Sequence, residues 1–121
     1  CERHHDWLDL ATNAVRTLAV RDYYWADLAP EAVALTFVAV LGGDGEFDTT
    51  VLNAVNLGRD ADTIAAMAGA IAGARLGYRA IREEWLPAVA VAPGVCLSVT
   101  AGGDPMLIAD QLVDMRSKGK T

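Results

Sequence analysis

The feature that most restricts the fold of this chain is an uninterrupted apolar stretch, Ile64 to Ala74, built mostly of alanine and glycine. The whole chain has 22 alanines and 11 glycines but only 7% aromatic residues, and small side chains favour closely packed helices over a sheet-built core. Gly69, Gly73 and Gly77 recur at four-residue spacing, and each costs about 1 kcal/mol relative to alanine inside a helix. Their shared face predicts a neighbouring backbone packed directly against it, within an all-α domain.

Composition and charge narrow the possible partners. With 53% hydrophobic residues and a mean hydropathy of +0.24, the 121-residue chain can bury enough apolar surface to avoid disorder. A net charge of −6 disfavours duplex nucleic acid and anionic membranes, and fits a cationic ligand or a metal ion. The longest apolar run is shorter than the ~20 residues of a membrane span, and Cys1 and Cys96 have no motif spacing, so we expect a cytoplasmic protein.

Apolar periodicity and end signals predict the helices. We expect helices over about 6–20 (with Asp6 as N-cap), 30–41, 47–57 and 62–77, and a last helix that starts at Asp104 and Pro105. Weak alternation over 88–101 allows an extended segment there. No repeat or linker divides the chain, so we expect one helical unit over 1–121.

The segment from Gly58 to Thr63 has the strongest chemical signal. Asp60, Asp62 and Thr63 place two carboxylates and a hydroxyl directly before the apolar helix, and oxygen ligands of this kind suit a hard cation such as Mg²⁺. Two residues apart, the aspartates bind one site together only if Asp60 lies on the loop and Asp62 in the first turn, which Gly58 permits. The alternative is that they merely cap the helix.

The same residues carry a family resemblance. The segment 56–63, with glycines at 69, 73 and 77, resembles the C-terminal metal motif of the ADP-ribosylglycohydrolases, and similarity is clear over about residues 22–86. The resemblance implies an all-α, multi-helix orthogonal bundle, of which this chain is the C-terminal part. It implies two Mg²⁺ ions between helices, with Asp60, Asp62 and Thr63 as metal ligands and Gly58 close to the substrate. Arg59 is expected to face substrate or solvent.

The implied activity is Mg²⁺-dependent hydrolysis of an N- or O-glycosidic bond in a ribosyl or ADP-ribosyl substrate. The family's remaining ligands and its catalytic acid lie on Gly-Asp and Thr/Ser-Asp-Asp motifs of an N-terminal half, and nothing comparable precedes Asp60 here. The catalytic residue is therefore expected on that half, which becomes the expected partner, either as a separate subunit or as part of one precursor. The alternative is a non-catalytic structural or regulatory helical module, and the sequence does not identify the leaving group.

Other groups give weaker signals. Cys1 suggests an N-terminal nucleophile, although such enzymes are built on stacked sheets and an inert terminus is the simpler interpretation. The adjacent His4 and His5 suit an exposed pair better than a metal site. The acidic loop 44–48 lacks the glycine and terminal glutamate of a calcium loop, and Trp25 can stack a base or pack in the core or at its rim.

Overall fold

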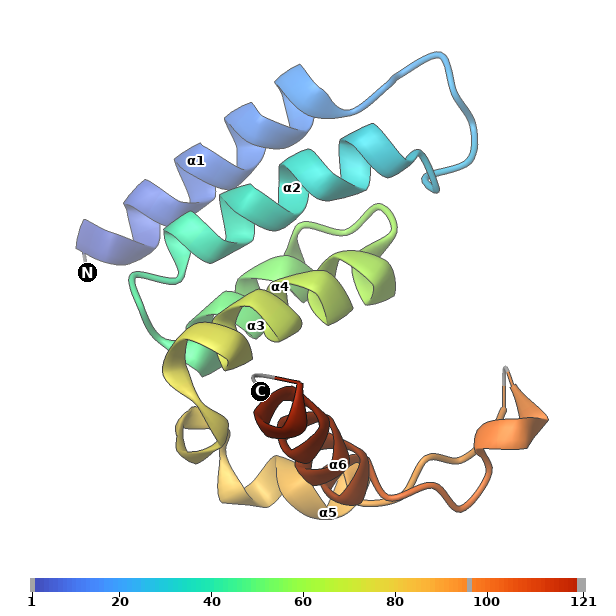
Figure 1. Ribbon diagram of the computed structural model, residues 1–121. Coiled ribbons are helices and arrows are strands. Elements are labelled where there is room, and N and C mark those ends of the chain that lie inside the picture. The colour runs from blue at the N-terminus through green and yellow to red at the C-terminus, as the bar shows by residue number, and fades with distance from the viewer. Residues whose placement is uncertain (1, 96, 120–121) are drawn as a thin grey trace. The chain divides into compact units, whose positions relative to one another are not determined.

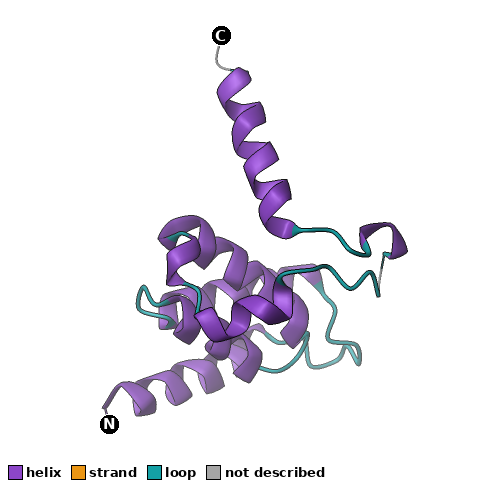
Figure 2. Ribbon diagram, turned by 90° about the horizontal axis from the view of Figure 1, so that it is seen from below, coloured by secondary structure: helices purple, strands orange, loops and turns teal. Residues whose placement is uncertain are grey.

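The computed structural model describes residues 2–95 and 97–119, and among these it contains helices and no strand (Figure 2). The prediction of an all-α fold is confirmed. Residues 1–81 form one compact unit, and residues 82–121 form another. The first unit contains α1 (Glu2–Leu18), α2 (Ala29–Gly42), α3 (Phe47–Asn56), α4 (Ala61–Leu76) and a 3-10 turn, η1 (Tyr78–Ala80).

The helix ends follow the signals in the sequence, with one exception. Pro30 lies in the first turn of α2, and α2, α3 and α4 begin and end within one residue of the predicted positions. The first helix starts at Glu2, so Asp6 lies inside it and the prediction of an N-cap there is wrong. No described helix combines the length and the apolar character needed to cross a membrane.

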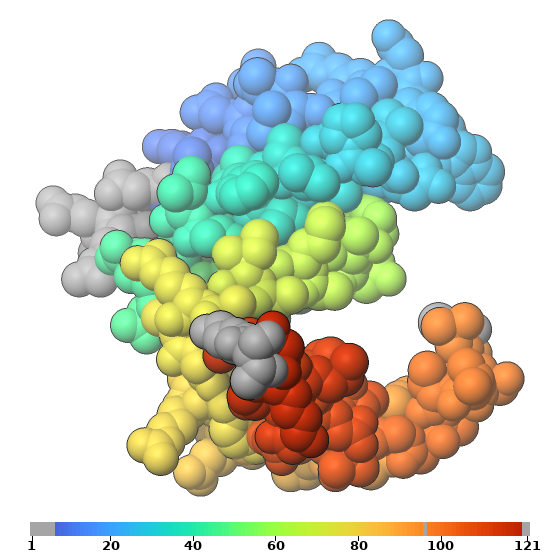
Figure 3. All heavy atoms as spheres, in the orientation of Figure 1, coloured from blue at the N-terminus to red at the C-terminus, as the bar shows by residue number. Residues whose placement is uncertain are grey.

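In the first unit the helices run back and forth, and each packs on its neighbours (Figure 1). Helix α4 packs against both α2 and α3, and α2 also contacts α1. In Figure 3 the cyan atoms of α2 lie between the blue atoms of α1 and the yellow-green atoms of α4. Small residues and two large side chains form the most deeply buried part of the core: Leu35, Ala39, Ala54, Ile64 and Ala68. The core therefore owes its close helix packing to alanine.

Close packing at glycine occurs in a different place from the one predicted. A Cβ on Gly69 or Gly73 would meet only side-chain atoms of α3, at ordinary distances of 3.5 and 3.7 Å, and Gly77 lies beyond the end of α4. The prediction of a backbone packed against these glycines is therefore wrong. A Cβ would instead overlap the Trp7 ring at Gly42 and the Thr50 hydroxyl at Gly43, where α2 ends.

Helix α2 is buried on one face only. Ala32, Leu35 and Ala39 are buried, whereas Val33, Phe37 and Leu41 follow one another at four-residue spacing and are 45%, 54% and 77% exposed. The sequence is apolar nearly all round this helix, which is typical of a helix covered on all sides. The first unit thus leaves an apolar stripe, Val33–Phe37–Leu41, open along α2.

The second unit consists of short elements and one longer helix: η2 (Glu83–Trp85), α5 (Leu86–Val89), η3 (Ser98–Thr100) and α6 (Pro105–Lys118). The expected extended segment over 88–101 is not a strand; its described part holds the end of α5 and the turn η3. Asp104 caps α6, because its carboxylate accepts hydrogen bonds from the N–H groups of Met106 and Leu107. None of the described side chains of this unit is buried.

Candidate metal centre

The loop between α3 and α4 has an unusual backbone. Gly58 and Arg59 are consecutive residues with positive φ, 71° and 58°. Glycine adopts this region readily, but a residue with a Cβ does so at a cost of roughly 1–2 kcal/mol. Asp60 follows with φ −82° and ψ 63° and is the residue that precedes α4. The left-handed backbone conformation of Gly58 and Arg59 therefore determines where Asp60 lies.

The three predicted ligand residues lie together at the start of α4. Asp60 is on the loop and half-buried, Asp62 lies in the first turn, and both Asp62 and Thr63 are exposed. This is the arrangement that joint ligation by the two aspartates requires. The Asp60 side chain makes no capping hydrogen bond, so the capping interpretation is wrong for this residue. Within the described part of the chain, the side chains of Asp62 and Thr63 have no hydrogen bond or ion pair either.

Arg59, which is expected to face substrate or solvent, is paired with Glu31 in the structure. Its guanidinium donates Nε–H to Oε1 of Glu31 and Nη2–H to Oε2 of Glu31, the latter at 3.1 Å. The Glu31 side chain is 1% exposed and that of Arg59 is 24% exposed. Oε2 of Glu31 also accepts a hydrogen bond of 2.8 Å from the backbone N–H of Val20, in the loop after α1. One buried carboxylate thus joins the loops that precede α2 and α4.

The electrostatics of this pair follow from its hydrogen bonds. Those donated by Arg59 lower the pKa of Glu31; burial opposes them, and the Val20 N–H and the arginine charge add to the lowering. The same bonds to Glu31 raise the pKa of Arg59. Both groups are therefore charged at neutral pH, and Glu31 remains a carboxylate although it is buried.

Sequence reasoning missed Glu31 as a member of this site. From the sequence alone, Glu31 is an acidic residue next to Pro30 in the first turn of the second helix, where its charge complements the helix dipole. A signal was available: Glu31 is the single charged residue in an otherwise apolar helix, and a charge in a core helix needs a partner. Nothing in local spacing identifies that partner as Arg59.

The donor set fits part of a magnesium site. Carboxylate and hydroxyl oxygens are the ligands that Mg²⁺ accepts, and those of Asp60, Asp62 and Thr63 have no protein partner in the described chain. Across residues 2–95 and 97–119, no three His, Cys, Asp or Glu side chains are grouped so that they could hold a metal ion by themselves. A complete site at this position needs ligands from elsewhere.

The other candidate groups are less organised. Asp44 and Glu46 are exposed, and the described residues form no metal-binding cluster around them. Tyr24 and Trp25 are 89% and 66% exposed and meet edge to face, so Trp25 is not packed in the core. Cys1 and the side chains of His4 and His5 lie outside the described part of the structure.

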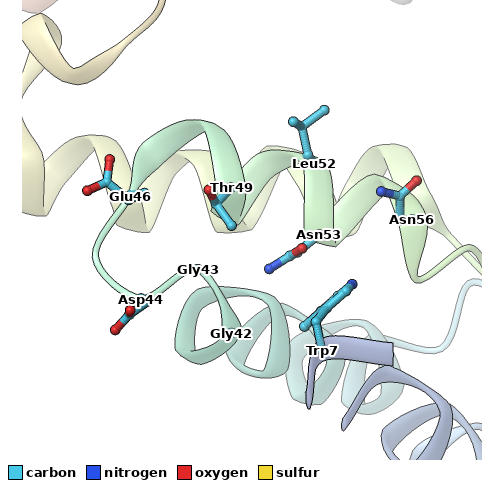
Figure 4. Close-up of a pocket in the computed structure, with 9 residues that line it drawn as sticks. All are labelled: Trp7, Gly42, Gly43, Asp44, Glu46, Thr49, Leu52, Asn53 and Asn56. Atoms are coloured by element: carbon cyan, nitrogen blue, oxygen red, sulfur yellow. The ribbon is translucent and has the colours of Figure 1, made fainter. Parts of the chain in front are cut away.

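A cavity of about 460 Å³ lies between α1, α2 and α3 (Figure 4). Trp7 and the buried Asn53 point toward one another across it, beside Gly42. Nδ2 of Asn53 has no hydrogen-bond partner among the described residues, although this atom is itself shielded from solvent. None of the predicted ligand residues lines the cavity, so it is separate from the start of α4.

Comparison with known proteins assigns the family. The sequence model of the ADP-ribosylglycohydrolases, described as "ADP-ribosylglycohydrolase", matches residues 2–120. The chain belongs to this family. In this chain the segment 56–63 runs from the last residue of α3 through the loop into the first turn of α4, and the prediction of the family is confirmed.

A relative in a second comparison is an uncharacterized protein of Archaeoglobus fulgidus. It is 45% identical over 56 residues, a stretch that covers 46% of this chain and 17% of the relative. This ADP-ribosylglycohydrolase chain therefore spans a small part of the length of the relative it matches. No solved structure matches the chain.

Proposed function

We propose that this ADP-ribosylglycohydrolase chain supplies Asp60, Asp62 and Thr63 as ligands for Mg²⁺ in a hydrolase that cleaves an N- or O-glycosidic ribosyl bond. The observation that carries the proposal is the set of oxygen side chains at the start of α4, which are neither capping the helix nor paired within the described chain. Unpaired acidic side chains next to one another repel, and a divalent cation relieves that repulsion.

Each residue has a distinct part in this proposal. Asp60 approaches the metal site from the loop, while Asp62 and Thr63 approach from the first turn of α4. Asp62 is the residue proposed to bridge two ions. Gly58 has no side chain, so the backbone there is free to come close to the substrate. When bound, Mg²⁺ would orient the ribosyl group and stabilise the charge that develops as the glycosidic bond breaks.

The partner in this proposal is an N-terminal half of the same enzyme or precursor, which carries the remaining ligands and the catalytic acid. Two observations support it. The described residues contain no grouping of three or more metal-binding acids, histidines or cysteines. The apolar stripe Val33–Phe37–Leu41 leaves a helix face open that further helices would cover. We propose that the assembled enzyme acts in the cytoplasm on a ribosyl or ADP-ribosyl substrate.

The test uses the chain assembled with the polypeptide that carries the remaining family motifs. Release of ADP-ribose from an ADP-ribosylated substrate is measured with Mg²⁺ and with a chelator. Hydrolysis is expected only with Mg²⁺, and Asp62→Asn is expected to abolish it. Asp114→Asn on α6, which also removes an exposed carboxylate, is the matched control and is expected to retain full activity.

Two results would contradict the proposal in different ways. Magnesium binding without hydrolysis of any ribosyl substrate would identify the chain as part of a non-catalytic module. Hydrolysis that persists in the chelator, or in Asp62→Asn, would exclude a role for these oxygens in holding the metal.

A further inference from the structure

The Glu31–Arg59 ion pair lies directly beside the proposed ligands, although neither member is itself one of them. Arg59 immediately precedes Asp60 in the chain, and its φ of 58° is unfavourable for a residue that has a Cβ. A conformation of this kind persists only when the surrounding structure holds it. Here the guanidinium is held at two points by a carboxylate that is almost fully buried.

The position of the Glu31 carboxylate is restricted by its place in the fold. Glu31 lies in the first turn of α2, and its carboxylate also accepts the N–H of Val20. A two-point contact between a guanidinium and a carboxylate restricts both distance and orientation. The position of Arg59, and with it the course of the backbone into Asp60, is therefore tied to the first turn of α2.

The pair also has an electrostatic consequence. An arginine next to two aspartates would normally be available to pair with them, and its charge would then compete with a metal ion for the same oxygens. In the described part of the structure the ion-pair partner of Arg59 is Glu31, while Asp60 and Asp62 have none. The positive charge of Arg59 is compensated by Glu31, so the guanidinium does not pair with either aspartate.

We propose that Glu31 and Arg59 are positioning residues, which together hold the Gly58–Asp60 loop in the conformation that presents the aspartates to Mg²⁺. Glu31 also prevents the guanidinium of Arg59 from pairing with the carboxylates of Asp60 and Asp62. This inference rests on the function proposed above. It adds two residues that touch neither metal nor substrate and act through Asp60.

The test measures metal binding to the assembled protein, with Mn²⁺ as a spectroscopic probe, because Mn²⁺ accepts the same oxygen ligands as Mg²⁺. Free and bound Mn²⁺ are distinguished by electron paramagnetic resonance, so the readout does not depend on activity. The variants are Glu31→Gln, Arg59→Ala and Arg59→Gly. Thr36→Val is the matched control, since it removes a buried hydrogen bond to Ala32 in the same helix, α2.

For Glu31→Gln and Arg59→Ala we expect the Mn²⁺ dissociation constant of the folded protein to rise at least about tenfold, in the range found for residues that support metal ligands. Arg59→Gly should bind more tightly than Arg59→Ala, because both lose the ion pair but glycine adopts the left-handed conformation without strain. Thr36→Val should lose stability and keep the wild-type dissociation constant.

Two outcomes would overturn the inference, and they are distinguishable. If the wild-type assembly binds Mn²⁺ but all three variants bind it equally well, the pair only stabilises the fold, and the proposed metal function remains. If the wild-type assembly does not bind Mn²⁺, the proposed function falls, and the positioning role falls with it. Because glycine adopts the left-handed conformation without strain, Arg59→Gly tests the inference even where Arg59→Ala fails to fold.

Discussion

Glu31 and Arg59 are 28 positions apart in the sequence, yet the buried carboxylate of one receives two hydrogen bonds from the guanidinium of the other. The contact joins the first turn of α2 to the loop before α4. Glu31 is much less accessible than Arg59, so the two residues are not equivalent energetically. A carboxylate that loses its partner here stays buried, whereas the guanidinium is able to turn toward water.

This asymmetry predicts unequal effects of single substitutions. Arg59→Gly should lower the free energy of unfolding, because it leaves a buried carboxylate with only the Val20 N–H, and this loss should exceed the backbone strain that glycine relieves. Glu31→Gln should cost less, about 1–2 kcal/mol, because a neutral amide retains part of the hydrogen bonding. Urea denaturation measures both. Arg75→Gln, at an exposed arginine of α4, is the control and should cost less than about 0.5 kcal/mol.

The double variant Glu31→Gln/Arg59→Gly completes the cycle. Because the two side chains contact one another, the double variant should be more stable than the sum of the single effects predicts, by at least about 1 kcal/mol. Strictly additive effects would mean that the two residues stabilise the protein independently.

The lowered pKa of Glu31 predicts a specific pH dependence of stability. The pKa is lower in the folded state than in the unfolded chain, mainly because of the hydrogen bonds from Arg59. The resulting stabilisation is fully present above the unfolded-state pKa and is lost as pH falls through the folded-state pKa. The free energy of unfolding of the wild type should therefore fall more steeply in acid than that of Glu31→Gln. A gap between the two that does not change with pH would contradict this.

The sequence predicted local features well because their causes are local. Pro30, the glycines after α2 and the polar residues before α4 mark helix ends through backbone geometry, which a short window contains. The positions of Asp60 on the loop and Asp62 in the first turn follow from local geometry too, because two residues that are two positions apart cannot share one face of a continuous helix. The Glu31–Arg59 pair was missed because apolar periodicity indicates on which face of its own helix a residue lies. It does not indicate which side chain, distant in the sequence, contacts that residue.

Glycine spacing in the sequence also did not locate the glycines that are closely packed, and Gly43 and Gly69 allow this to be tested. Gly43→Ala should destabilise the first unit by about 1–3 kcal/mol, because the new Cβ overlaps the hydroxyl of Thr50, whose own Cβ is 2.9 Å away. Gly69→Ala should instead be neutral or stabilise by up to about 1 kcal/mol, since the added methyl meets only Val51 at 3.5 Å and improves helix propensity. The stabilities of the two variants are compared by thermal unfolding. Loss of stability in Gly69→Ala would restore the idea of close packing on that face.

Truncation of the two aspartates that precede α6 and α4 should affect stability to different extents. The carboxylate of Asp104 accepts hydrogen bonds of 2.8 and 3.3 Å from Met106 and Leu107, whereas Asp60 makes no such bond at the start of α4. Asp104→Ala should therefore weaken the start of α6 by about 1 kcal/mol, and Asp60→Ala should change the stability of the metal-free protein by less than about 0.5 kcal/mol.

Hydrogen exchange of the first-turn amides of α6 and α4 measures these effects separately in the same protein. Faster exchange is expected at α6 in Asp104→Ala, and unchanged exchange at α4 in Asp60→Ala. The decisive comparison adds Mg²⁺ to the assembled protein: the ion should slow exchange at the start of α4 in the wild type and not in Asp60→Ala, because a ligand protects only the state that binds it. Faster exchange at α4 in metal-free Asp60→Ala would mean that Asp60 supports the helix after all.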